Sequence, residues 1–223
     1  MQLQYLCDKI STGDFMRLRN VKNKEDIMNA SAYLIRNPFE YKGKWHGLFN
    51  NDNPIYVEIG MGKGQFIINN AINYPNINFI GIEKYDSVIA KGLQKIPEGL
   101  NNLFMIRADA LNIDEIFYRE IDKIYLNFSD PWPKNRHHLR RLSSHVFLKK
   151  YESIFKNEKN IEMRTDNENL YTYSLVSFST FGYKLEEVSL NLHRDNMPLI
   201  TTEYEDKFSN LDMPIYYVKC MKE

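Results

Sequence analysis

The amino-acid sequence predicts an α/β fold, in which a mostly parallel, seven-stranded sheet with an antiparallel C-terminal strand carries helices on both faces. Three observations support this fold class. Short runs rich in β-branched residues alternate with helix-like segments between residues 55 and 181. The first of these runs leads directly into a glycine-rich turn. The last two strand-like runs, near the C-terminus, are separated only by a polar segment.

The alternation begins at residue 55. Residues 55–59 are a β-branched run that predicts a strand, and residues 65–72 predict a helix with Phe66 and Ile67 facing inward. Two further strand and helix pairs follow, at 77–82 with 87–95 and at 103–106 with 113–118. Strands that alternate with helices imply a parallel sheet whose ligand site lies at the carboxyl ends of its strands.

The second half continues the pattern and then changes it. A strand at 121–128 precedes a helix that Ser143 or Ser144 is expected to cap, with Phe147 and Leu148 on its apolar face. A strand at 161–164 and a helix at 169–181 follow, and the strands 184–190 and 215–221 form a terminal antiparallel pair. In the N-terminal part we expect a helix at 24–34 and a loop at 37–49.

Length and composition favour a single enzyme-sized domain. Of the 223 residues, 43% are hydrophobic, which suffices for a substantial core. We expect residues 1–53 to form an extension with a helix that packs on the domain formed by residues 54–223. No run approaches the roughly 18 apolar residues of a membrane span, and the N-terminus lacks a secretory pattern, so no membrane partner and a cytoplasmic location are expected. Cys7 and Cys220 stand alone, which supports neither disulfides nor a metal site.

A glycine-rich loop follows the strand at 55–59. Gly60, Gly62 and Gly64 occupy every second position, whereas a dinucleotide-binding loop needs a Gly-x-Gly-x-x-Gly spacing. Glycine allows the backbone to approach a ligand with positive φ angles. Glu58, directly before the loop, is suited to meet a cation such as the ammonium group of a methionine moiety.

Two more acidic residues follow the next two strands. Glu83 lies 21 residues after Gly62 and is suited to accept hydrogen bonds from both ribose hydroxyls of an adenine nucleoside, and Asp109 is suited to meet the adenine edge. Each acid alone is as readily a helix cap or a surface residue. Together the three acids follow three successive strands, and the pattern resembles the S-adenosylmethionine site of class I methyltransferases.

The fourth strand ends in Asp130-Pro-Trp-Pro, where class I methyltransferases place the loop that holds the methyl acceptor. The two prolines stiffen the loop and so hold Asp130 in place, while Trp132 either stacks on a base or fills the core. No acidic residue occurs between Pro131 and Tyr151. In this window, residues 136–141 form a basic stretch that predicts contact with phosphates, although such runs are often merely solvated. Its histidines are expected to be polar surface residues rather than metal ligands.

Two later polar patches suit the recognition of guanine. Asp166 and Glu205 are carboxylates, which accept hydrogen bonds side by side from the N1–H and N2–H₂ groups of that base. Either residue is equally well explained as a cap or a turn residue.

Several motifs together resemble the bacterial tRNA (guanine-N7)-methyltransferases, a family of class I, Rossmann-like methyltransferases that use S-adenosylmethionine. The resemblance runs from about Met16 to near the C-terminus, and Met61 departs from it by standing where threonine is common. Residues 1–15 precede the point where such proteins usually begin. The motifs are Met16-Arg-Leu-Arg-Asn20, Tyr41-Lys-Gly-Lys-Trp45, Ile59-Gly-Met-Gly-Lys-Gly-Gln-Phe66, Gly81-Ile-Glu83, Leu126-Asn-Phe-Ser-Asp-Pro-Trp-Pro-Lys134, the basic stretch 136–141, Thr165-Asp-Asn167 and Thr202-Glu-Tyr-Glu-Asp-Lys-Phe208.

The resemblance implies a methyltransferase domain at 54–223 that methylates N7 of the guanine at position 46 in the tRNA variable loop, without a metal, as a monomer or homodimer. Asp130 carries over as the catalytic residue. The cofactor-binding positions are Glu58, Gly60, Gly62, Gly64, Glu83, Asp109, Ala110 and Asp130. The substrate-binding positions are Lys134, Asp166, Thr202, Glu203, Tyr204 and Glu205, and the RNA-contacting positions are Arg136, His137, His138, Leu139, Arg140 and Arg141.

Three rival functions remain open on the sequence. A nicotinamide-dependent oxidoreductase shares the fold and the ribose-binding acid, but the glycine spacing speaks against it. A noncatalytic RNA-binding module has no use for a cofactor loop. A methyltransferase that acts on amino groups of RNA or DNA usually carries two adjacent prolines and an aromatic residue, where this chain has Trp132 between its prolines.

Overall fold

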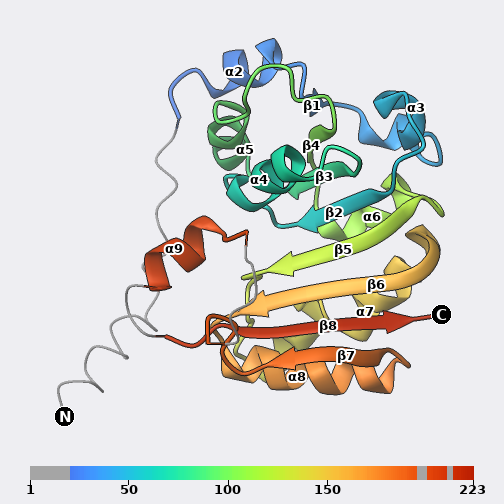
Figure 1. Ribbon diagram of the computed structural model, residues 1–223, viewed down its shortest axis with the longest axis vertical. Coiled ribbons are helices and arrows are strands. Elements are labelled where there is room, and N and C mark those ends of the chain that lie inside the picture. The colour runs from blue at the N-terminus through green and yellow to red at the C-terminus, as the bar shows by residue number, and fades with distance from the viewer. Residues whose placement is uncertain (1–20, 195–199, 210–212) are drawn as a thin grey trace.

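The computed structural model describes residues 21–194, 200–209 and 213–223. Their strands form one eight-stranded sheet in the order β1-β4-β3-β2-β5-β6-β8-β7 (Figure 1). The strands are β1 (Leu34–Ile35), β2 (Ile55–Ile59), β3 (Asn78–Glu83), β4 (Leu103–Arg107), β5 (Ile121–Asn127), β6 (Phe155–Thr165), β7 (Lys184–Ser189) and β8 (Tyr216–Lys222). β8 runs antiparallel to both of its neighbours, and the pairings from β1 through β6 are parallel. The α/β fold and all seven expected strands are confirmed, and β1 is an additional edge strand.

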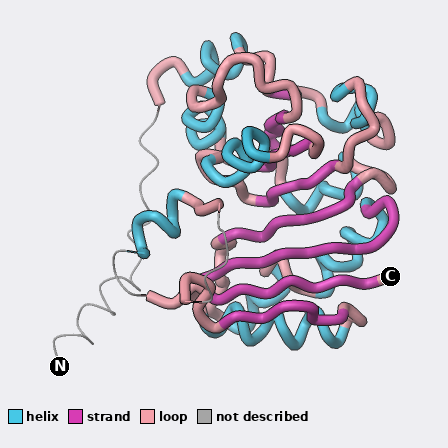
Figure 2. Tube along the Cα trace, in the orientation of Figure 1, coloured by secondary structure: helices cyan, strands magenta, loops and turns pink. Residues whose placement is uncertain are grey.

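Helices cover both faces of the sheet, as expected (Figure 2). α4 and α5 lie on one face, and α6, α7 and α8 lie on the other. The helices are α2 (Lys24–Ala30), α3 (Trp45–Phe49), α4 (Gln65–Asn73), α5 (Asp86–Leu93), α6 (Ile113–Ile116), α7 (His145–Ile154), α8 (Glu168–Thr180) and α9 (Glu203–Ser209), with short 3-10 helices η1 (Pro38–Tyr41), η2 (Ala110–Asn112) and η3 (Asn135–Arg140). No helix in the described ranges is long and apolar enough to cross a membrane.

The central strands are buried on both faces, which explains why they read as continuous apolar runs. In β3, five successive residues from Asn78 to Ile82 are buried. One apolar cluster packs around Val57, Ile124 and Tyr151, and a second packs around Phe66, Ile67 and Phe79 beneath α4 and α5. These two layers fix the sheet, so the loops at its carboxyl edge have a rigid base.

The segment from residue 21 to residue 53 is built into this core more closely than its sequence indicated. The helix expected at 24–34 ends at Ala30, because Ser31 is extended and the chain then pairs with Met105 and Ile106 of β4 as strand β1. The loop expected at 37–49 contains η1 and α3. Trp45 of α3 is fully buried, and its indole N–H donates to the carbonyl of Ile116.

The expected helix cap at Ser143 or Ser144 is not formed by a side-chain hydrogen bond. Ser144 is the N-cap residue of α7, but its hydroxyl donates to the carbonyl of Leu139 and makes no capping bond. Cys220 is a buried free thiol. Cys7 and the 16–20 motif lie outside the described residues.

Candidate active site

The candidate site lies at the carboxyl ends of the parallel strands, where the loops after β2, β3, β4, β5 and β6 converge. α9, which belongs to the connection between β7 and β8, lies beside this edge of the sheet (Figure 1). Parallel strands of a doubly wound sheet bind ligands at this edge. The topology therefore brings together the loops after β2, β3, β4, β5 and β6, which carry the predicted residues from Glu58 to Asp166.

The glycine loop between β2 and α4 depends on positive φ angles. Gly60, Gly62 and Gly64 have φ angles of 78°, 58° and 77°. A Cβ at Gly60 or Gly62 would meet nothing within 4 Å, so these glycines are required by the backbone conformation and leave open space beside the loop. A Cβ at Gly64 would lie 2.8 Å from Met105 Cε, so here close packing also demands glycine. The amides of Gly60 and Met61 both donate to the carbonyl of Ile82, which fastens the loop to β3.

Glu58 is a buried carboxyl group with half of its hydrogen-bonding capacity unused. It is the penultimate residue of β2, and its Oε1 accepts a hydrogen bond of 2.9 Å from the side-chain amide of Asn127. Oε2 has no hydrogen-bond partner among the described residues. Burial raises the pKa of Glu58 to about 8, although the Asn127 hydrogen bond and the Arg164 charge act in the opposite direction. A buried, half-satisfied carboxyl group of this kind is prepared to receive a cationic donor.

Glu83 and Asp109 stand at the ends of the two neighbouring strands. Glu83 accepts hydrogen bonds from the amides of Lys84, Tyr85 and Gly62, which orient its carboxylate toward the glycine loop. Burial raises the pKa of Glu83 despite these bonds. Asp109 caps η2, which Ala110 begins, by accepting from the amide of Leu111.

Lys84 links these two acids. Its Nζ lies 2.6 Å from Asp109 Oδ2, and this hydrogen bond lowers the pKa of Asp109 against the opposing effect of burial. The structure thus confirms the cap role of Asp109, and its role at the adenine edge stays a prediction.

Asp130 follows β5 and is exposed. Burial is the main cause of the raised pKa of Glu83, and the negative charge of Asp130 acts in the same direction. Two non-glycine residues flanking Asp130 have positive φ angles, 49° at Phe128 and 42° at Trp132. Such conformations occur in the sharp, constrained loops of functional sites.

The basic segment after this loop forms η3, beginning after Lys134. Arg136, His138, Leu139 and Arg140 are exposed. The guanidinium of Arg140 lies 4.9 Å from the ring centroid of Trp132, and His137 packs edge-on against the same ring at 5.9 Å. Desolvation and the positive charges of Arg140, Arg136 and Lys134 lower the pKa of His137. Trp132 is half-buried, so its ring supports the basic segment rather than filling the core.

Arg141 differs from the rest of this segment. It is 7% exposed and donates hydrogen bonds to two carbonyls of the acceptor loop, those of Pro131 and Trp132. The run predicted to contact RNA thus contains an outward-facing part, residues 136–140, and one buried arginine.

Asp166 follows β6 and accepts a hydrogen bond of 3.0 Å from the hydroxyl of Tyr204. Burial and the Asp166 charge raise the pKa of Tyr204, which keeps its hydroxyl protonated. The Tyr204 ring lies 4.7 Å from the ring of Phe128, between centroids. The structure therefore brings the predicted guanine-binding residue Asp166 together with Tyr204 of α9. Tyr204 in turn contacts Phe128, which precedes Asp130 by two positions in the chain.

Thr202 and Glu205 form a capping box at the start of α9. The amide of Glu205 donates to the Thr202 hydroxyl at 3.0 Å, and the amide of Thr202 donates to Glu205 Oε2 at 2.8 Å. Glu205 is fully buried and also pairs with Arg164 at 3.2 Å. Its carboxylate is occupied within the protein, so it supports α9 rather than presenting itself to a base.

Glu203 fastens α9 to the glycine loop. Its carboxylate pairs with Lys63 of the loop at 2.7 Å and with Lys95 beyond α5. The side chain of Asp206 accepts a hydrogen bond from Gln65, the first residue of α4. α9 thereby contacts both the loop proposed for the cofactor and the aspartate proposed for the acceptor.

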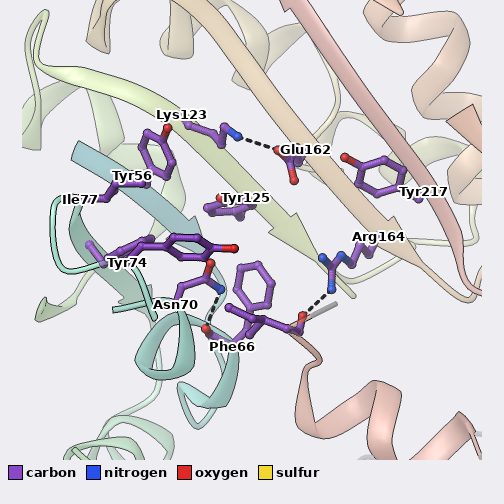
Figure 3. A pocket seen from close by; sticks show the side chains of 12 residues that line it. Tyr56, Phe66, Asn70, Tyr74, Ile77, Lys123, Tyr125, Glu162, Arg164 and Tyr217 are labelled. Carbon is purple, nitrogen blue, oxygen red and sulfur yellow. Dashed lines mark hydrogen bonds and ion pairs between the residues drawn. The ribbon is translucent and has the colours of Figure 1, made fainter. Parts of the chain in front are cut away.

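A cavity of about 310 Å³ lies beside the site, on the sheet face next to α4 (Figure 3). Tyr56, Tyr125 and Tyr217 line it, together with a 2.7 Å ion pair between Lys123 and Glu162. None of the site residues predicted from the sequence lines this cavity. Arg164 does line it, and its guanidinium also donates a hydrogen bond to Glu205 of α9.

Sequence reasoning missed three residues on which the site depends. Asn127 and Arg164 lie at the carboxyl ends of β5 and β6, but both strands also contain other polar residues, so neither position stood out. Lys63 gave no signal beyond being in the glycine loop. The capping box was visible as Thr-x-x-Glu, but the polar segment containing it was not recognised as a helix.

Comparison with known proteins gives a consistent result. A family described as putative methyltransferase matches residues 52–218. The tRNA (guanine-N(7)-)-methyltransferase of Bacillus velezensis is 49% identical over 205 residues, which cover 90% of this chain and 94% of that protein. The proteins of the same name from Bacillus subtilis and Streptococcus pneumoniae are 47% and 45% identical and cover 90% and 92% of this chain, and 96% and 99% of their own lengths.

Solved structures share the fold at low identity. A structure described as an antibiotic-related methyltransferase has a TM-score of 0.62 and 17% identity, and the match covers 81% of this chain and 93% of that one. A 16S rRNA methyltransferase has a TM-score of 0.59 and 11% identity, with 80% and 92% covered. These likenesses support the class I methyltransferase fold.

Proposed function

Because this chain belongs to the tRNA (guanine-N7)-methyltransferase family, we propose that it methylates N7 of the guanine at position 46 in the tRNA variable loop. Its identity to the named relatives supports the reaction and the tRNA substrate. The position within tRNA rests on the resemblance of the acceptor motifs. Because tRNA is its substrate, we propose that the enzyme acts in the cytoplasm.

The residues at the carboxyl edge fit S-adenosylmethionine. Glu58 Oε2, which has no hydrogen-bond partner in the part of the chain that the structure describes, is proposed to accept a hydrogen bond from the ammonium group. The open space at Gly60 and Gly62 is proposed to admit the methionine moiety beside the backbone. Glu83 is proposed to hold the ribose hydroxyls, and Asp109 with Ala110 the adenine edge. When bound, this cofactor supplies a sulfonium methyl group, whose bond to sulfur breaks as the guanine N7 lone pair forms the new bond and the released electron pair stays on sulfur.

Guanine N7 carries a lone pair and no proton, so the protein does not need a general base. Its task is to align the base and to stabilise the positive charge that grows on the purine. Asp130 is the proposed catalytic residue, because it is an exposed carboxylate on a constrained loop whose charge reaches the Glu83 site. Its carboxylate would oppose the developing purine cation.

The proposed guanine contacts lie between β6 and α9. Asp166 is proposed to accept from guanine N–H groups, with its Tyr204 hydrogen bond fixing the carboxylate. Thr202, Glu203 and Glu205 contribute by holding α9 in place. Lys134, exposed at the start of η3, is proposed to contact the substrate beside Asp130.

The outward-facing part of the basic segment is proposed to bind tRNA phosphates. We expect Arg140→Ala to raise the KM for tRNA severalfold and to lower the slope of log K against log salt by about one, because one phosphate contact is lost. Filter binding at several salt concentrations measures this slope. The matched control is Lys156→Ala, which removes one exposed cation at the amino end of β6, away from the candidate site at the carboxyl ends of the strands. It is expected to leave the slope unchanged. Equal slopes for wild type and Arg140→Ala would contradict the phosphate contact.

The assigned acceptor is tested by labelled methyl transfer to two tRNA transcripts that differ only at position 46. With guanine there we expect 7-methylguanosine in the digested product, and with adenine there we expect at least a hundredfold less label, since binding contacts alone allow selectivity of about this order. Equal labelling of both transcripts would exclude position 46 as the acceptor. Label in an exocyclic amino group would instead identify an amino-directed methyltransferase.

A further inference from the structure

We propose that Arg141 is a positioning residue, which holds the acceptor loop so that Asp130 faces the methyl acceptor, and that it does not bind tRNA phosphate. This inference rests on the proposed function. It separates Arg141 from its neighbour Arg140, although the two adjacent arginines are indistinguishable in the sequence.

The hydrogen bonds of Arg141 are directed at the backbone of the loop. Nε donates to the carbonyl of Pro131 at 2.9 Å, and Nη2 donates to the carbonyl of Trp132 at 3.2 Å. Pro131 and Pro133 have no N–H, so the loop has few donors of its own. A planar guanidinium can satisfy two successive carbonyls at once, and the ammonium of a lysine lacks this fork geometry.

The loop conformation needs such support. Trp132 has a φ of 42°, a left-handed conformation that is strained for a residue other than glycine. Prolines fix their own φ angles but do not fix the φ of the tryptophan between them. The bond from Arg141 to the carbonyl of Trp132 holds this residue from the buried side, and Arg140 covers its ring from the exposed side.

The other contacts of Arg141 anchor it to the core. Its guanidinium lies 4.4 Å from the ring centroid of Tyr173 in α8. Its amide donates to the carbonyl of His138, and its carbonyl accepts from the amide of Ser144 at the start of α7. One side chain therefore connects α8 to the Asp130 loop, while its backbone connects η3 to α7.

The burial of Arg141 argues against a direct contact with a tRNA phosphate. Arg141 is 7% exposed, whereas Arg140 is exposed, so a phosphate approaching η3 meets Arg140 first. Reaching a phosphate would require Arg141 to release both carbonyls of the loop. Loss of Arg141 is therefore expected to disturb the position of Asp130 and not the binding of tRNA.

The test compares Arg141→Lys and Arg141→Ala with Arg140→Ala in methyl transfer to tRNA. We expect both Arg141 variants to lose kcat by roughly tenfold to a hundredfold, since a misplacement of about 1 Å can cost that much, with the KM for tRNA within about twofold and an unchanged salt slope. Arg140→Ala is expected to raise the KM for tRNA and to reduce the salt slope, with kcat nearly unchanged. A raised KM and a reduced salt slope in Arg141→Lys would overturn the proposal and return Arg141 to the phosphate contacts.

A double-mutant cycle with Asp130→Asn shows whether Arg141 acts through Asp130. In the Asp130→Asn background we expect Arg141→Lys to cost less than threefold in kcat, because the group that it positions is already gone. Multiplicative losses would overturn the proposal. If Arg141→Ala does not fold, Tyr173→Leu carries the same test from the other side of the guanidinium, and Tyr173→Phe, which keeps the ring, is its control. Absence of methyl transfer by the wild-type enzyme would instead refute the proposed function, so the two failures are distinguishable.

Discussion

Asp130→Asn is expected to lower kcat by about a hundredfold while leaving the KM for tRNA nearly unchanged. The substitution keeps the shape of the side chain and removes its negative charge, which we propose opposes the positive charge that grows on the purine as N7 is methylated. Preorganised electrostatic groups of this kind contribute roughly a hundredfold to a thousandfold to catalysis. Single-turnover rates with saturating cofactor and tRNA measure this loss separately from binding.

The matched control is Asp52→Asn, the same change at an exposed aspartate before β2, at the opposite edge of the sheet. It is expected to retain wild-type kcat. If Asp130→Asn also turns over at the wild-type rate, with unchanged affinities for cofactor and tRNA, the electrostatic role of Asp130 is refuted and the loop serves only to shape the site.

Glu58→Gln is expected to stabilise the protein without cofactor and to weaken cofactor binding at the same time. Burial raises the pKa of Glu58 from its usual 4.5 to about 8, so the folded protein keeps a proton that the unfolded chain has lost between these values. In this window each pH unit costs the wild type up to about 1.4 kcal/mol of folding stability. Below pH 4.5 both states are protonated and the effect vanishes. Glutamine stays neutral, so the stability advantage of the variant should grow as pH rises toward 8.

Thermal unfolding and calorimetry measure the two expected effects, on folding stability and on cofactor affinity. Thermal unfolding from pH 5 to pH 8 should show a flatter decline for Glu58→Gln than for wild type, and parallel profiles would show that Glu58 does not titrate as described. Calorimetry with S-adenosylhomocysteine should show affinity reduced by about tenfold or more, the size of one hydrogen bond to a charged group. The wild type should also release a proton on binding near pH 7, which the variant cannot do.

Much of the fold was predictable because burial on both faces leaves a strong mark on the sequence. Strand β2 occupies 55–59 as expected, and the boundaries of β3, β4 and β5 lie within one residue of the predicted ones. β1 escaped prediction because two residues, Leu34 and Ile35, carry no readable period, and their strand exists only by pairing with β4. Tertiary contact, and not local preference, determines such an element.

The site was predictable where a residue type is tied to a position along a strand. Glu58 and Glu83 lie in the last two residues of β2 and β3, Asp109 and Asp130 follow β4 and β5, and the fold places these strand ends at one edge of the sheet. The sequence could not separate Arg141 from Arg140, because spacing says nothing about which of two adjacent arginines turns inward. It also could not show that Glu205 is occupied by Arg164, since the two are far apart in the chain and meet only through the packing of α9.

α9 belongs to a connection between strands at one side of the sheet, away from the strands that carry Glu58 and Glu83. Apart from Asp130, the residues proposed for the cofactor lie between β2 and η2, whereas α9 lies in the connection between β7 and β8, the last two strands at one side of the sheet. An edge connection can be lengthened or exchanged without repacking the centre of a sheet. α9 is part of such a connection, and Glu203, which pairs with Lys63 of the glycine loop, is a side chain whose contact any change in this connection would have to preserve.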